Sequence, residues 1–125
     1  MAVVLQEIKD SDFEYILKAT TTGTNSAASL VDASAAEGAA TDPRLSIVSV
    51  SWSVAAQTDI LWDATTNVVA LSLSGSGNMG HTHDMPAIPN TNASGATGDV
   101  LITNGTSVGT IIIKFRKISG WDNIT

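Results

Sequence analysis

The two histidines of the chain are the residues whose types and spacing come closest to a chemical site. His81 and His83 are separated by one residue, and Asp84 follows them. In an extended backbone, residues two apart project to the same side, so both imidazoles can reach one first-row metal ion, with Asp84 as a further ligand or orienting group. Two ligands from one chain bind weakly, and a single His-X-His pair often arises by chance. We therefore favour the alternative, a pair of exposed loop histidines without metal.

The sequence contains no recognisable catalytic set. It has no Gly-X-Ser-X-Gly elbow for a nucleophilic serine. Residues 75–80 match Gly-X-Gly-X-X-Gly, but they follow a predicted strand without leading into a helix, so a dinucleotide site is not expected. Asp59 and Asp63 flank Trp62 in a pattern that a glycosidase could use, although solvated strand ends explain it better. We expect no enzymatic activity and no cofactor.

The composition excludes several classes of partner. The 125 residues include only six Lys and Arg and carry a formal net charge of −6, whereas nucleic-acid binders concentrate basic residues. The same acidic balance disfavours anionic membranes. No cysteine is present for a disulfide or a thiolate metal site. The N-terminal residues lack a basic region followed by a sustained apolar run, and no stretch reaches transmembrane length, so we predict synthesis in the cytoplasm.

Alternation of apolar and polar residues with a period of two predicts antiparallel strands. The clearest example is residues 45–54, where Val50, Trp52 and Val54 alternate with serines. Trp52 is accordingly expected in the core, and Trp62 is expected to cap one end of it. The other predicted strands are residues 3–8, 13–20, 27–31, 59–62, 68–74, 100–103 and 110–118.

The last predicted strand, residues 110–118, gives the most detailed expectation. Ile111, Ile113 and Phe115 are predicted to face the core, and Ile112 to face a subunit contact or a second core. The basic residues of this segment are expected on the solvent face of the strand. They are Lys114, Arg116 and Lys117.

About eight strands separated by turns predict an all-β fold, a single-domain antiparallel β-sandwich or jelly-roll-like barrel over residues 1–125. Residues 75–98 differ from the rest, because they are rich in Gly, Asn, Pro and Ser and show no alternation. A segment of this length exceeds an ordinary hairpin connection. It is predicted to be a long functional or interface loop.

The order of segments between residues 45 and 117 resembles small virion structural proteins of tailed phages, notably those that infect marine cyanobacteria. The segments that carry this resemblance are residues 47–54, 61–63, 69–77, 95–101 and 110–117. The resemblance implies a structural component of the virion. We infer from it a capsid decoration or cement protein that binds at symmetry axes on the capsid surface. Its expected partners are the major capsid protein and further copies of the chain, as in a homotrimer, with no nucleic acid and no membrane.

Two alternatives stay open. One is a tail, neck or fibre adaptor module, since His81 and His83 resemble the His-X-His metal sites of trimeric phage fibre tips. The other is a carbohydrate-binding module, which would require exposed aromatic side chains. For any of these functions, the residues predicted at the interface are Met79, Met85, Pro86, Ile88, Ile112 and Trp121.

Overall fold

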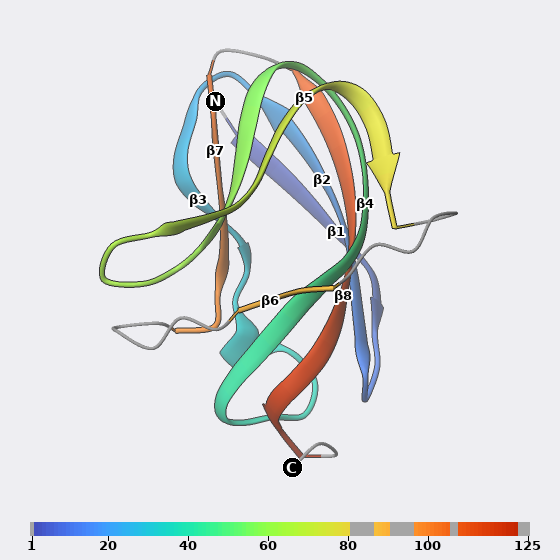
Figure 1. Ribbon diagram of the computed structural model, residues 1–125, viewed down its shortest axis with the longest axis vertical. Coiled ribbons are helices and arrows are strands. Elements are labelled where there is room, and N and C mark those ends of the chain that lie inside the picture. The colour runs from blue at the N-terminus through green and yellow to red at the C-terminus, as the bar shows by residue number, and fades with distance from the viewer. Residues whose placement is uncertain (1, 81–86, 91–96, 106–107, 123–125) are drawn as a thin grey trace.

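The computed structural model describes residues 2–80, 87–90, 97–105 and 108–122, and it consists almost wholly of strands (Figure 1). The one helical element among these residues is a short 3-10 turn, η1. This architecture confirms the predicted all-β fold of the barrel or sandwich type. The elements are β1 (Ala2–Asp10), β2 (Glu14–Thr22), β3 (Asn25–Val31), η1 (Ala33–Ala35), β4 (Ala39–Trp62), β5 (Val68–Met79), β6 (Ile88–Pro89), β7 (Val100–Asn104) and β8 (Gly109–Trp121).

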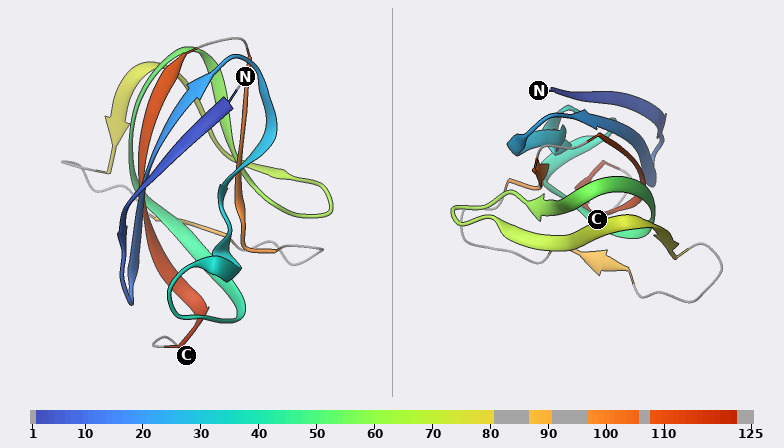
Figure 2. Two further views of the ribbon diagram at one scale, coloured as in Figure 1. Left: turned by 180° about the vertical axis from the view of Figure 1, so that it is seen from behind. Right: turned by 90° about the horizontal axis from the view of Figure 1, so that it is seen from above.

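The strands form one curled antiparallel sheet in the order β1-β2-β8-β4-β7-β3, with β5 and β6 also paired to β4. Figure 2 shows the sheet curling round on itself, and its two terminal strands, β1 and β3, come into contact. The apolar side chains on the concave side therefore pack into one core. No helix in the described ranges is long and apolar enough to cross a bilayer.

Strand β4 connects the two halves of this curled sheet, one formed by β1, β2 and β8 and the other by β7 and β3. Residues 45–54 pair with β8, and residues 58–62 pair with β7. The sequence predicted separate strands at 45–54 and 59–62, but β4 is continuous and accommodates its change of neighbours through register shifts. Such irregularities increase the local twist of a strand, which lets one long strand serve both halves.

Strand β8 lies between β2 and β4 and shows the predicted alternation. Ile111, Ile113 and Phe115 are buried, whereas Ile112 and Arg116 are exposed. Burying three large apolar side chains contributes about 2 kcal/mol each to folding. These contacts fix which side of β8 faces the core.

The predicted loop at residues 75–98 begins later than expected. Strand β5 continues to Met79, so Gly75–Met79 are paired with β4 rather than forming a loop. Gly77 lies opposite Trp52, and a Cβ on Gly77 would stand 3.0 Å from Cζ2 of that indole. The glycine thus leaves room for the ring, whose Nε1 donates to the carbonyl of Ser74 at 3.0 Å. Trp52 packs against the core but is only half-buried, which corrects its predicted core position.

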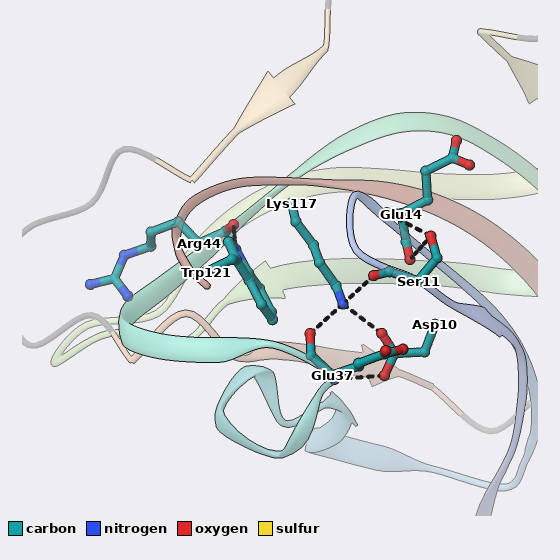
Figure 3. Close-up of polar contacts among 7 residues, drawn as sticks. All are labelled: Asp10, Ser11, Glu14, Glu37, Arg44, Lys117 and Trp121. Carbon is teal, nitrogen blue, oxygen red and sulfur yellow. Dashed lines mark hydrogen bonds and ion pairs between the residues drawn. The ribbon is translucent and has the colours of Figure 1, made fainter. Parts of the chain in front are cut away.

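The charged side chain of Lys117 is fully buried, against the prediction that it faces solvent (Figure 3). Its Nζ donates at 2.6 Å to the Asp10 carboxylate and to the backbone carbonyls of Ser11 and Glu37. The same ammonium lies 4.7 Å from the centre of the Trp121 ring. Three acceptors match the three N–H donors of an ammonium, so the buried charge has a complete set of hydrogen bonds.

The partners of Lys117 are themselves held in place. The second oxygen of Asp10 accepts the backbone N–H of Glu37 at 2.8 Å, and Trp121 Nε1 donates to the carbonyl of Arg44 at 2.8 Å. The Lys117 network therefore joins the β1–β2 turn, the segment before β4, the start of β4 and the end of β8.

Replacing Lys117 with methionine should destabilise the protein by about 3–5 kcal/mol, because it leaves Asp10 and two carbonyls without their donor. Urea unfolding followed by tryptophan fluorescence measures the change. Lys114→Met, three residues earlier on the exposed side of β8, is the matched control and should cost about 1 kcal/mol or less. Similar losses for the two variants would show that the buried network has no special role in stability.

Candidate binding face on the outer side of the sheet

The predicted metal ligands His81 and His83 lie outside the described residues, as do Asp84, Met85 and Pro86. Within the described ranges, no group of three His, Asp or Glu side chains is arranged to hold a metal ion. The predicted interface residues that the structure does describe all lie in strands.

The remaining predicted interface residues occupy different environments. Trp121 is buried, and its ring contacts Lys117. Its side chain therefore packs inside the protein and does not face a partner. Met79 and Ile88 are half-buried against the core. Only Ile112 presents a large exposed apolar surface, with 39% of its area accessible.

Ile112 lies at the centre of a face that we call the outer face, the convex side of β2, β8 and residues 45–54 of β4. Its paired neighbours are Lys18 on β2 and Ser51 on β4. One pair further along, Ile16 and Ser49 flank Lys114 in the same way. Side chains of paired residues point to the same side of a sheet, so these residues form one continuous surface.

Two shallow hollows meet at Ile112. One, of about 270 Å³, is lined by residues that include Ile16, Val48 and Lys114. The other, of about 260 Å³, is lined by residues that include Ser51 and Ile112. Pockets for small molecules usually measure about 300–1,000 Å³, so these hollows better suit single protruding side chains.

Glu14 is the anion of the outer face. Its two carboxylate oxygens bind Lys9 Nζ at 2.8 Å and Lys114 Nζ at 3.0 Å. Hydrogen bonds from Lys9 and Lys114, reinforced by their charges, lower the pKa of Glu14 from 4.5 to about 2. The carboxylate orders two long side chains at one edge of the face.

Because the pKa of Glu14 is lower in the folded than in the unfolded chain, its stabilising effect is complete above about pH 4.5. The effect should disappear as the pH falls toward about 2, when the folded carboxylate takes up its proton. Carboxyl-detected NMR titration of Glu14 measures this pKa directly. In Lys9→Met/Lys114→Met it should return toward 4.5, while a pKa that stays near 2 would contradict the assigned cause.

The aromatic and acidic residues around Trp62 do not form an exposed sugar platform. Trp62 is buried. The flanking carboxylates are engaged within the chain, since Asp59 accepts from Ser72 Oγ at 2.7 Å and Asp63 accepts from Thr97 Oγ1 at 2.8 Å. The predicted role of Trp62 as a cap on the core agrees with this burial.

In comparisons with known proteins, no family model, no curated protein and no solved structure matches this chain.

Sequence reasoning identified Ile112 but missed the residues around it. Ile16 and Lys18 belong to the strand predicted at residues 13–20, which the sequence did not connect with Ile112. The sequence signal was Ile16, an apolar residue that alternates with Glu14 and Lys18 on an otherwise polar side of its strand. The pairing of β2 with β8 was needed to place the two isoleucines on one surface.

Proposed function

We propose that the chain is a virion structural protein of a tailed phage, a decoration or cement protein that binds the outside of the capsid. The observation that carries the proposal is the outer face, where Ile112 is 39% exposed between two hollows and has no covering element in the described chain. Exposed apolar surface bordered by polar residues is typical of sites for protein association. The resemblance over residues 45–117 implies a structural component of the virion, and we infer from it that the partner is the capsid.

The physical properties of the fold suit this role. A capsid offers the same binding site many times, so a small module that bridges neighbouring capsid subunits gains strength through multivalency. Such a module must hold its shape while it bridges. The long strand β4, the paired strands around it and the Lys117 network supply that rigidity. A homotrimer on a local three-fold axis is the assembly that we propose for it.

Cryo-electron microscopy of the purified virion tests the proposal, together with the copy number measured by quantitative mass spectrometry. We expect density for the chain at repeated positions on the capsid and a copy number comparable with that of the major capsid protein. Density confined to the tail or neck, with few copies, would replace the decoration role with the adaptor role. Absence of the chain from purified particles would exclude both.

Loss of the chain should also weaken the particle. Virions assembled without it should release their DNA at a lower temperature than wild-type virions, and added purified protein should restore the difference. Release is measured by the fluorescence of a DNA-binding dye during heating. Equal release temperatures would contradict a cementing role.

A further inference from the structure

We propose that the outer face docks onto an acidic protein surface of the particle, with apolar side chains of that partner entering the two hollows at Ile112. This inference rests on the proposed virion function and specifies the binding face and the chemistry of its partner.

The first observation is the distribution of positive charge. Of the six basic residues, Lys117 is buried and Arg44 lies near the start of β4. The other four lie on the outer face or at its edge with β1: Lys9, Lys18, Lys114 and Arg116. Segments 14–22, 45–54 and 109–121, which build this face, contain a single acidic residue, Glu14. The face is therefore basic although the whole chain carries a charge of −6.

A group of three acidic residues lies elsewhere in the fold. Asp32, Asp63 and Asp99 lie together beside β7, where Asp99 accepts the backbone N–H of Ala33 at 2.9 Å. Burial and the neighbouring charges of Asp32 and Asp63 raise the pKa of Asp99. This separation of charge gives the molecule a basic face and an acidic remainder, so an acidic partner is drawn to the outer face in one orientation.

The second observation is the apolar centre inside the basic border. Ile112 and Ile16 lie between the lysines, and both line the first hollow. An apolar centre with a charged rim is the usual arrangement of a protein–protein interface. The basic residues around the centre, which we call the basic rim, favour an acidic partner. The apolar centre supplies the apolar surface that is buried on binding.

The same observations disfavour two other occupants. Two copies of the chain joined face to face by a two-fold axis would bring two predominantly basic surfaces together, and like charges in contact are repulsive. Nucleic acid requires many phosphate contacts, whereas Lys9 and Lys114 already share Glu14 and the centre of the face is apolar. An acidic protein surface satisfies both the rim and the centre.

The apolar centre is tested with Ile112→Asp. Binding of the purified variant to virions that lack the chain should be about thirtyfold weaker than wild type, as expected for a residue at the centre of an interface. Val69→Asp is the matched control, because Val69 on β5 is more exposed, at 53%, and lies away from the outer face. It should bind like wild type, and both variants should keep the wild-type circular dichroism spectrum. Equal binding by Ile112→Asp and wild type would overturn the proposal.

The basic rim is tested with Lys18→Gln/Arg116→Gln, which lowers the net charge by two. We expect about fivefold weaker binding, mostly through slower association, and a weaker dependence on salt. Thr65→Glu/Thr66→Glu changes the net charge equally in the exposed β4–β5 turn and is the control. If the control loses as much affinity as the rim variant, the effect belongs to the overall charge and the proposed rim is wrong.

Carbodiimide cross-linking identifies the partner, since it joins lysine amines to carboxylates in direct contact. In assembled virions, Lys18 and Lys114 should be linked to Asp or Glu of the major capsid protein. Links from these lysines to a second copy of the chain, or tight binding of the purified protein to a short DNA duplex, would overturn the acidic capsid partner. Failure of wild-type protein to bind virions at all would instead contradict the proposed function, so the two failures are distinguishable.

Discussion

The buried ammonium of Lys117 is the interaction on which the rest of the structure depends. Removing a charge from water costs several kcal/mol unless the protein replaces its hydrogen bonds. Here Asp10 and the carbonyls of Ser11 and Glu37 do so, and each comes from a segment distant from Lys117 in the chain. The network therefore forms only when the β1–β2 turn, the segment before β4 and the end of β8 have assembled. Lys117 lies on the same side of β8 as the buried Ile111, Ile113 and Phe115, and Ile112, Lys114 and Arg116 therefore lie on the opposite side.

The surface that results is shaped by strand pairing as much as by side-chain type. Strand β4 contributes serines to the outer face and Val50 to the core, because it alternates in step with β8. Ser49, Ser51 and Ser53 have small side chains, and they line the two hollows beside Ile112. The hollows thus arise from small residues placed next to large ones on neighbouring strands. This pattern produces a surface suited to receive side chains.

The outer face differs in charge from the rest of the described chain. Glu14 holds Lys9 and Lys114 at one edge, while Lys18 and Arg116 lie on the same face. Three acidic residues, Asp32, Asp63 and Asp99, lie together beside β7, away from this face. A charged molecule with this asymmetry is oriented by the field of its partner before contact, which increases the fraction of productive encounters. An acidic chain can in this way present a basic docking face.

The sequence by itself determined the all-β fold, most strand positions and the inward and outward sides of β8, because period-two alternation is a local property of the chain. Even Ile112 was identified as outward-facing from its neighbours alone. Only the tertiary structure decided that residues 45–62 form one strand, that Gly75–Met79 pair with it, and that Lys117 points inward. The physical reason is that these outcomes depend on partners far away in sequence. Asp10 lies 107 residues from Lys117, and its carboxylate makes burial of that lysine favourable. Likewise, Ile16 and Ile112 become one surface only through the pairing of β2 with β8.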